Sequence, residues 1–253
     1  MDEAAIQAVL ARTRRELAAP APGARTGAAA AAAAPRAPFY LAIAGNIGVG
    51  KSMVTELLGA RFGWPTFYEP VIENPYLDDY YRDMRRWAFQ LQIYFLSKRF
   101  EVQKQILDRG GAAVQDRTIY EDVEIFAPTL HRRGCIDDRD YASYREIFLN
   151  MTAFLRPPDL ILYLRATPAV TLARIKSRGR ACEQGIQPDF IEALHEAYER
   201  WIGGGAATLC PVRVIDTERV NLRDDPAARA ELFRQIEAHC AAKSAQAADG
   251  KGG

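Results

Sequence analysis

Short runs of apolar residues alternate with longer amphipathic stretches along most of the chain. Five short runs predict β-strands, at residues 39–44, 65–68, 112–115, 159–164 and 212–215. The stretches between and after them predict helices, at residues 51–62, 82–108, 122–133, 140–155, 168–177, 191–201 and 225–241. Short apolar strands separated by helices are typical of a parallel sheet covered on both faces. We therefore expect an α/β fold with a five-stranded parallel sheet, which binds ligands beyond the carboxyl ends of its strands.

The two ends of the chain lack this pattern. After a short amphipathic stretch, the N-terminal part is rich in Pro, Gly and Ala and includes an alanine run at residues 28–34. Such a segment has little apolar surface to bury, so we expect residues 1–38 to be a disordered extension. Residues 242–253 are also poor in apolar side chains, and we expect a flexible tail there. The compact domain is then expected to span residues 39–241.

The composition limits the classes of partner. The 253 residues are 49% hydrophobic and 26% charged, with a formal net charge of +1. This balance gives no reason to expect a nucleic acid polymer or a membrane as a partner, whereas a small phosphorylated ligand needs only a local positive pocket. No apolar run approaches the roughly 20 residues that span a bilayer. The four cysteines and three histidines have no metal-ligand spacing, which fits a cytoplasmic protein without a disulfide framework.

One segment carries a complete phosphate-binding motif. Residues 45–52 match the pattern G-x-x-x-x-G-K-[ST] at every required position, after a predicted strand and before a predicted helix. Backbone N–H groups in such a loop surround phosphate oxygens, the lysine reaches the β- and γ-phosphates, and the serine hydroxyl holds Mg²⁺. The motif predicts a triphosphate site without choosing among kinases, ATPases and GTPases. Its residues are Gly45, Asn46, Ile47, Gly48, Val49, Gly50, Lys51 and Ser52.

Charged residues at the ends of two predicted strands add groups that phosphoryl transfer to an alcohol requires. Glu69 ends the second strand and is either a general base or a solvated carboxylate. Asp116 and Arg117 end the third strand, where they can anchor Mg²⁺ and contact the reacting oxygens, or form a structural ion pair. Three arginines near the end of a predicted helix either close over a triphosphate or form a solvated basic helix end. They are Arg174, Arg178 and Arg180.

Five motifs, taken in order, resemble the deoxynucleoside kinase family. They are the loop at residues 45–52, Tyr-Glu-Pro-Val at 68–71, Arg-Trp-Ala-Phe-Gln-Leu-Gln at 86–92, Asp-Arg-Thr-Ile-Tyr-Glu-Asp at 116–122 and Arg-Gly-Arg-Ala-Cys-Glu-Gln-Gly at 178–185. The resemblance runs from about residue 39 to the last helix. It implies a P-loop kinase fold with an arginine-rich lid, and ATP-dependent, Mg²⁺-assisted phosphorylation of the 5′-hydroxyl of a deoxynucleoside in nucleotide salvage. Members of the family are commonly homodimers, which we carry over as an expectation.

The same resemblance implies roles for single residues. Glu69 corresponds to the base that takes the proton of the 5′-hydroxyl, with Arg117 beside it and Lys51 on the donor phosphates. Tyr81 and Glu183 correspond to the pair that binds the sugar 3′-hydroxyl. The three arginines named above fall in the lid that closes over ATP.

The resemblance assigns four further residues to the recognition of the nucleobase. Gln92 corresponds to the glutamine that reads the base edge, and Phe126 to the aromatic that stacks on the base. Arg99 and Asp122 accompany purine or cytosine substrates in the family, whereas thymidine-accepting relatives carry small or apolar residues there. Together with the sequence at residues 73–77, which looks like the bacterial purine-specific branch, this predicts a deoxyadenosine or deoxyguanosine kinase, with deoxycytidine as a further substrate.

Two other functions share parts of the pattern. A nucleoside monophosphate kinase of the thymidylate kinase type has the same fold and loop but needs basic residues for the acceptor phosphate. A non-catalytic nucleotide-binding regulatory protein would bind ATP and need no base at Glu69. Assays on nucleosides and on monophosphates separate these alternatives.

Overall fold

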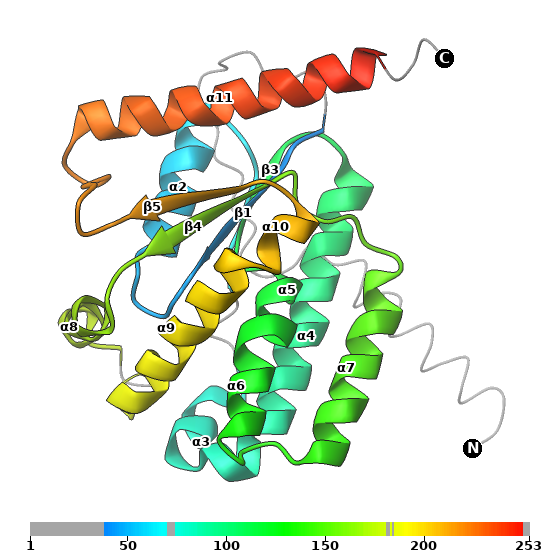
Figure 1. Ribbon diagram of the computed structural model, residues 1–253, viewed down its shortest axis with the longest axis vertical. Helices are drawn as coiled ribbons and strands as arrows, with labels where there is room; N and C mark the ends of the chain where they lie inside the picture. Colours follow the sequence, from blue (N-terminus) through cyan, green and yellow to red (C-terminus); the bar gives the residue numbers. More distant parts are fainter. Residues whose placement is uncertain (1–37, 70–73, 181–182, 184, 250–253) are drawn as a thin grey trace, which may run out of the picture.

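A five-stranded parallel sheet forms the centre of the molecule, in the order β2-β3-β1-β4-β5 (Figure 1). The computed structural model describes residues 38–69, 74–180, 183 and 185–249. The sheet confirms the predicted α/β fold, and each observed strand overlaps a predicted one. The strands are β1 Tyr40–Gly45, β2 Thr66–Phe67, β3 Ala113–Asp116, β4 Leu160–Arg165 and β5 Val212–Asp216.

Helices cover both faces of the sheet (Figure 1). The helices α2 and α11 pack on one face, and the other helices of the central part of the chain pack mainly on the opposite face. Their bounds are α2 Lys51–Phe62, α3 Leu77–Arg82, α4 Met84–Arg109, α5 Ile119–Glu121, η1 Asp122–Phe126, α6 Ala127–Arg132, α7 Asp138–Thr152, α8 Pro168–Arg178, α9 Pro188–Gly203, α10 Ala206–Leu209 and α11 Pro226–Asp249.

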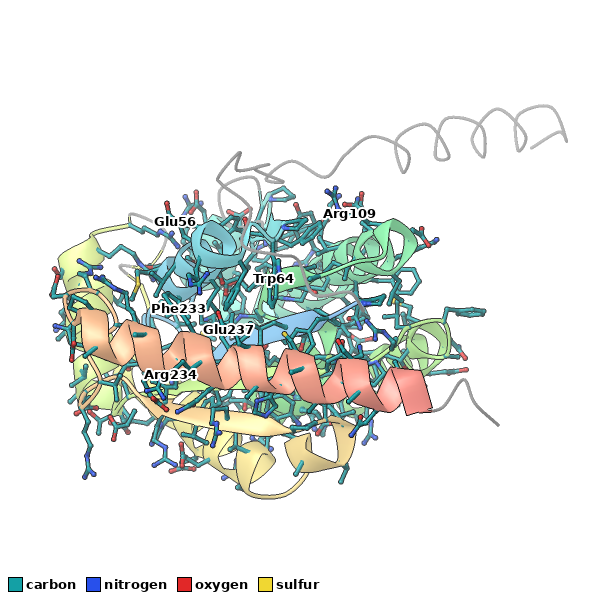
Figure 2. The ribbon with its side chains drawn as sticks, turned by 90° about the horizontal axis from the view of Figure 1, so that it is seen from above. Glu56, Trp64, Arg109, Phe233, Arg234 and Glu237 are labelled. Carbon is teal, nitrogen blue, oxygen red and sulfur yellow. The ribbon has the colours of Figure 1, made fainter. Side chains whose placement is uncertain are left out.

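The central strand β1 shows why a layer of helices is needed on each side. All six of its residues are buried, although neighbouring side chains of a strand point to opposite faces. Leu41 and Ile43 join the cluster formed with α2 and α11, while Ala42 and Ala44 join the cluster on the other face. On this face, Phe233 lies on α11 (Figure 2), and its ring meets that of Phe62 in α2 edge-on, with 5.8 Å between the ring centroids. A strand buried on both faces reads as a continuous apolar run, as this one does.

Strand register brings the functional segments together. β1 pairs with β3 so that Ile43 lies opposite Asp116, and it pairs with β4 so that Gly45 lies opposite Leu164. Because the strands are parallel, their carboxyl ends lie along one edge of the sheet. The residues after β1 and after β3 are therefore neighbours in space.

Three predicted helix boundaries need correction. The helix expected to begin at residue 82 begins instead at Met84, because Asp83 has a non-helical φ of −145° and its side chain accepts the N–H of Arg86 at 3.0 Å as the N-cap of α4. The short helix α3 before it was not predicted. The helix expected at residues 122–133 begins as the wide turn η1, in which the Ala127 N–H bonds the carbonyl of Asp122 five residues earlier.

The last helix was expected to end at residue 241, with a flexible tail from 242. It continues to Asp249, so the expected tail is helical over residues 242–249. The alanines, glutamine and lysine of this stretch are good helix formers. Lys243 also forms an ion pair with Asp159. The predicted extension at residues 1–38 lies almost wholly outside the described residues.

Candidate active site

A cleft of about 1460 Å³ lies at the carboxyl ends of the strands. One wall comes from residues 47–54 and 56, and other walls come from α3, α4, α8 and residues 217–218 and 220–223. Glu69 and Arg117, which follow β2 and β3, lie between them. This is the position at which a parallel sheet binds ligands, so the fold places the sequence motifs where chemistry is expected. The apolar part of the wall includes Leu77, Leu91, Phe95 and Phe190, which we did not predict.

The phosphate-binding loop is packed against two helices. Gly48 has φ +80°, and a Cβ atom there would lie 2.7 Å from Ile175 Cγ1 and 2.8 Å from the Thr171 carbonyl oxygen. Only glycine fits this left-handed conformation beside α8. Asn46 turns away from the cleft, since its Nδ2 donates to the carbonyl of Ile191 in α9 at 3.0 Å. Among the predicted loop residues, Asn46 therefore supports the loop, and residues 47–52 line the cleft.

Lys51 and Ser52 begin α2 inside the cleft. The Lys51 Nζ donates to the carbonyls of Gly45 and Asn46 at 2.9 and 3.0 Å. Burial, followed by the nearby Arg117 guanidinium, lowers the pKa of Lys51 to about 8. A negatively charged ligand would favour the charged form of this lysine, which makes it suited to phosphate binding.

Ser52 and Asp116, the two residues predicted to hold Mg²⁺, are in direct contact. The Ser52 hydroxyl donates to Asp116 Oδ2 at 2.7 Å, and Asp116 Oδ1 is buried with no hydrogen-bond partner among the described residues. Oxygen ligands of this kind fit Mg²⁺, which is commonly held by one or two protein groups together with water and phosphate oxygens. Within the described part of the chain no group of three or more His, Cys, Asp or Glu residues is arranged for a metal. A Mg²⁺ ion here would therefore take most of its ligands from water and phosphate.

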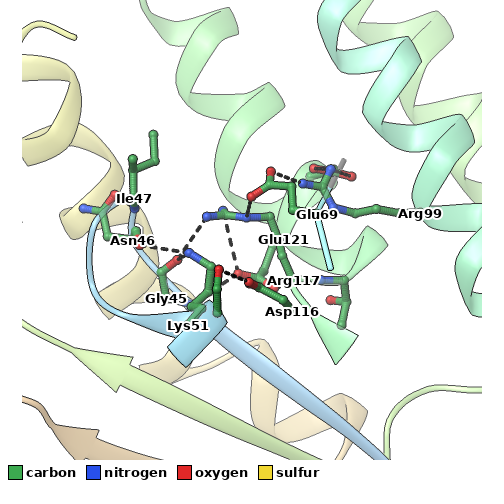
Figure 3. Close-up of polar contacts among 12 residues, drawn as sticks. Gly45, Asn46, Ile47, Lys51, Glu69, Arg99, Asp116, Arg117 and Glu121 are labelled. Atoms are coloured by element: carbon green, nitrogen blue, oxygen red, sulfur yellow. Dashed lines mark hydrogen bonds and ion pairs between the residues drawn. The ribbon is translucent and has the colours of Figure 1, made fainter. Parts of the chain in front are cut away.

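Glu69 lies between two arginines (Figure 3). Its Oε1 accepts from Arg99 Nη2 at 2.6 Å, and its Oε2 lies 3.4 Å from Arg117 Nε. Burial alone would raise the pKa of this carboxyl, but Arg117, Arg99 and Lys51 outweigh burial and lower it to about 2. Glu69 is therefore ionised at neutral pH. The direct contact with Arg99 was not predicted, because the two residues are 30 positions apart.

Arg117 is held in an unusual conformation. Its φ is +67°, the one non-glycine positive φ among the described residues. Such backbone costs about 1–3 kcal/mol and persists only where the surroundings enforce it, commonly at active sites. The guanidinium lies 4.4 Å from the centroid of the Phe126 ring, and its Nη2 donates to the Gly45 carbonyl at 3.3 Å. The side chain is thus fixed between the phosphate-binding loop, Glu69 and Phe126.

The residues predicted to contact the nucleobase divide into two groups. Gln92 and Phe126 line the cleft, and Gln92 Oε1 is a buried acceptor with no hydrogen-bond partner in the described ranges. Arg99 and Asp122 do not line the cleft. Arg99 Nη1 donates to both carboxylate oxygens of Asp122, at 2.6 and 2.7 Å, and both side chains are buried. Arg99 also connects this buried pair to Glu69.

The predicted lid arginines do not act as one group. Arg178 donates to both carboxylate oxygens of Glu183 at 2.7 Å, and Arg180 lies 3.4 Å from the same carboxylate. Arg174 instead donates to the Val49 carbonyl at 3.2 Å and to Thr217. Arg174 therefore connects the phosphate-binding loop to the residues after β5. Glu183 and Tyr81, which were predicted to bind the sugar, both line the cleft.

Two buried residues of the site were missed by sequence reasoning. Glu121 accepts the N–H of Thr118 at 2.9 Å and that of Gly45 at 3.3 Å. Its Oε1 also accepts the hydroxyl of Tyr198 at 2.7 Å. The spacing of Thr118 and Glu121 is that of a capping box and was a usable signal. No signal marked Tyr198, because an aromatic residue on an amphipathic helix is usually part of the core.

Comparison with known proteins agrees with this arrangement. The sequence profile of the family described as "Deoxynucleoside kinase" matches residues 41–241. The chain is 41% identical to the deoxyadenosine/deoxycytidine kinase of Bacillus subtilis (strain 168) over 78% of this chain and 90% of that protein. It is 40% identical to the deoxyadenosine kinase of Dictyostelium discoideum over 77% and 78% of the two chains.

A solved structure of deoxyadenosine kinase from M. mycoides, with the products dCMP and dCDP bound, is similar to the whole described domain. Its TM-score is 0.71 at 30% sequence identity, and the match covers 79% of this chain and all of that one. The five-stranded parallel sheet, the phosphate-binding loop and the profile match lead to one conclusion: this chain belongs to the deoxynucleoside kinase family.

Proposed function

We propose that this protein transfers the γ-phosphate of ATP to the 5′-hydroxyl of a purine deoxynucleoside, with deoxycytidine as a further substrate, in nucleotide salvage. The observation that carries the proposal is the ionised carboxylate of Glu69, held by Arg99 and Arg117 in the same cleft as the phosphate-binding loop. A triphosphate-binding protein without an acceptor would need no such carboxylate. Relatives named deoxyadenosine and deoxyguanosine kinases support the acceptor class.

On the donor side, the loop and Lys51 bind the β- and γ-phosphates, and Ser52 and Asp116 hold Mg²⁺. The bound ion supplies positive charge that offsets the charge developing on the phosphate oxygens. Arg117 faces the same region and, with its guanidinium fixed, stabilises that charge without reorganising. Arg178 and Arg180 complete the positive surroundings from the lid.

On the acceptor side, Glu69 accepts the proton of the 5′-hydroxyl as the oxygen attacks phosphorus. Its low pKa makes it a weak base, which suits proton transfer late in a loose phosphoryl transfer. Tyr81 and Glu183 bind the sugar 3′-hydroxyl, and Phe126 stacks on the base. Gln92 offers a donor and an acceptor to the base edge, and its unpaired Oε1 needs such a partner.

The proposed preference for purines rests on the family resemblance, in which an arginine and an aspartate at the positions of Arg99 and Asp122 accompany purine or cytosine substrates, since this buried pair itself does not line the cleft. A phosphorylation assay with ATP, Mg²⁺ and each of the four deoxynucleosides tests it, with deoxyadenosine monophosphate as an added acceptor. We expect turnover of deoxyadenosine and deoxyguanosine, weaker turnover of deoxycytidine and little of thymidine. Thymidine turnover as fast as purine turnover contradicts the specificity, and turnover of the monophosphate alone contradicts the acceptor class.

We also propose that the protein is a homodimer in the cytoplasm, with residues 1–38 as an extension before the kinase domain at 39–241. No helix of the described chain is long and apolar enough to cross a bilayer. The dimer is supported by apolar side chains on and after α7 that are exposed to solvent: Leu149 is 60% and Phe154 80% exposed. Light scattering after size exclusion should give twice the 28.2 kDa of the chain, and the monomer mass after Leu149→Lys. A wild-type monomer mass contradicts this.

A further inference from the structure

The hydroxyl of Tyr198 lies between two buried, oppositely charged groups. It accepts a hydrogen bond from Arg117 Nη1 at 2.8 Å and donates one to Glu121 Oε1 at 2.7 Å. Those two charged atoms are 3.9 Å apart. All three side chains are buried, so no bulk water shares their hydrogen bonds. The hydroxyl therefore separates a guanidinium and a carboxylate that would otherwise pair directly.

Direct pairing would change the direction in which Arg117 points. A charge-assisted hydrogen bond between guanidinium and carboxylate prefers a distance of about 2.7–2.9 Å. Closing the gap from 3.9 Å would draw the Nη1 end of the guanidinium by about 1 Å toward Glu121. The same guanidinium contacts the Gly45 carbonyl through Nη2 and lies beside Glu69 through Nε. A shift of the guanidinium toward Glu121 would change the geometry of both contacts.

Tyr198 also belongs to a wider set of bonds that ties α9 to the phosphate-binding loop. Glu121 Oε1, which receives the Tyr198 hydroxyl, also accepts the N–H of Gly45. One turn into α9, the carbonyl of Ile191 accepts Asn46 Nδ2. The Tyr198 ring meets Phe126 edge-on at 6.5 Å, and Phe126 in turn carries the Arg117 guanidinium on its face. The helix thus supports the loop and the arginine together.

We propose that Tyr198 is a positioning residue, whose hydroxyl keeps Arg117 apart from Glu121 and directed at the phosphoryl group in transfer. The proposal rests on the proposed kinase function, because it assigns Arg117 to the reacting oxygens. The Tyr198 hydroxyl is therefore expected to affect the rate of phosphoryl transfer. Tyr198 does not line the cleft, so the binding of ATP and nucleoside has no direct contact to lose.

The chain offers a matched control in Tyr163 of β4. Its ring stacks on that of Tyr198, with centroids 5.7 Å apart and planes at 19°. Its hydroxyl, however, donates to Glu199 at 2.9 Å and has no bond to Arg117 or Glu121 among the described residues. Tyr198→Phe and Tyr163→Phe each remove one buried tyrosine hydroxyl and keep the ring. A loss from general destabilisation would appear in both variants.

The first test compares steady-state kinetics of the wild type and the two variants on deoxyadenosine. We expect Tyr198→Phe to lower kcat by roughly 10- to 100-fold, as misplacing a catalytic group by about 1 Å does. KM for ATP should change less than about threefold, and Tyr163→Phe should stay near the wild type. Equal kcat in the two variants overturns the proposal, and so does a loss confined to KM.

A double-mutant cycle tests the reason for the loss. Glu121→Gln removes the charge that would attract Arg117, and its single amide oxygen, at the position of Oε1, can still accept the Tyr198 hydroxyl and the Gly45 N–H, while the bond from the Thr118 N–H is lost. In that background Tyr198→Phe should lower kcat by less than about threefold, because the two effects share one cause. A loss as large as in the wild-type background overturns the assigned role.

The second test does not depend on turnover. Side-chain ¹⁵N–¹H NMR should show protected guanidinium protons for Arg117 in the wild type and in Tyr163→Phe, shifted in Tyr198→Phe. The Arg117 signals are identified by their loss in Arg117→Lys. An unshifted spectrum refutes the positioning role. If the wild type phosphorylates no nucleoside, the proposed function fails, and the NMR result still decides whether Tyr198 fixes Arg117.

Discussion

Arg99 is the shared cation of two carboxylates, and its removal is predicted to destabilise the fold in a pH-dependent way. It bonds both oxygens of the buried Asp122 and one oxygen of Glu69. Arg99→Met keeps an unbranched apolar side chain of similar length and removes the charge. Lys104→Met is the control on the same helix, since Lys104 pairs with Asp108 at 2.7 Å in an exposed ion pair.

The expected loss of stability in Arg99→Met follows from the burial of its ion pair with Asp122. Removing one partner of a buried ion pair costs about 3–5 kcal/mol, whereas an exposed pair contributes at most about 1 kcal/mol. For a domain of this size, each 1 kcal/mol lowers Tm by about 2–4 °C. We therefore expect Arg99→Met to lower Tm by roughly 6–20 °C and Lys104→Met by less than about 4 °C.

The loss of stability in Arg99→Met is expected to change with pH in a definite direction. Burial raises the pKa of Asp122 and Arg99 opposes that rise, so removing Arg99 raises the pKa further and destabilises the folded state as pH rises. The pKa of Glu69 is lowered to about 2 from 4.5, so its ion pairs stabilise the fold above about pH 4.5 and lose this contribution as pH falls. Removing Arg99 weakens that contribution. The Asp122 effect makes the deficit of Arg99→Met larger at pH 8 than at pH 5, whereas the Glu69 contribution is nearly the same at both pH values.

Thermal unfolding followed by circular dichroism at pH 8 and pH 5 measures both quantities. We expect the Tm of Arg99→Met to lie far below that of the wild type at pH 8 and closer to it at pH 5. The Tm of Lys104→Met should lie slightly below that of the wild type by nearly the same amount at both pH values. Equal Tm values for the two variants, or a deficit for Arg99→Met that is independent of pH, would refute the reasoning about the shared cation.

Three further predictions concern the donor side. Gly48→Ala should weaken ATP binding, measured by calorimetry, by at least tenfold, because the added Cβ would meet α8. Gly110→Ala is the control and should bind ATP normally, because Gly110 also has a positive φ of +64° but open space around it; equal ATP affinities of the two variants would contradict the packing argument. Burial lowers the pKa of Lys51 to about 8, so ATP binding near pH 8 should take up protons, and the affinity for ATP should fall at higher pH. Calorimetry in buffers of different ionisation heat measures this proton uptake, and a measured uptake of zero would contradict the prediction. Asp116→Asn should raise the Mg²⁺ concentration for half-maximal turnover by roughly tenfold, and Asp108→Asn should not; equal Mg²⁺ curves would remove Asp116 from the metal site.

The fold was predictable because its signals are local. The central strands β1 and β4 are short apolar runs, and the phosphate-binding motif lies between the first strand and its helix. Boundaries set by single backbone angles, such as the start of α4 after Asp83, were not predictable from the hydrophobic pattern. The helical stretch after residue 241 was missed because low apolar content was taken as a sign of a tail, although helix propensity and the Lys243 contact favour a helix.

The candidate site was predictable in its members but not in its connections. Gln92, Phe126 and Glu183 were named from the family resemblance, and the structure brings them to one cleft with Glu69. The bond from Arg99 to Glu69 joins residues 30 positions apart, and no local pattern encodes it. The same holds for Tyr198, whose partners come from other elements of the fold. The chemical roles assigned to these residues stay predictions.

The central claim is that Glu69 is the base of an ATP-dependent purine deoxynucleoside kinase, and Glu69→Gln tests it most directly. The measurement is turnover of deoxyadenosine by the variant, together with ATP affinity by calorimetry on the same preparation. We predict that kcat falls by roughly 10²- to 10⁴-fold while the Kd for ATP changes less than about threefold. Turnover by Glu69→Gln at the wild-type rate would contradict the account.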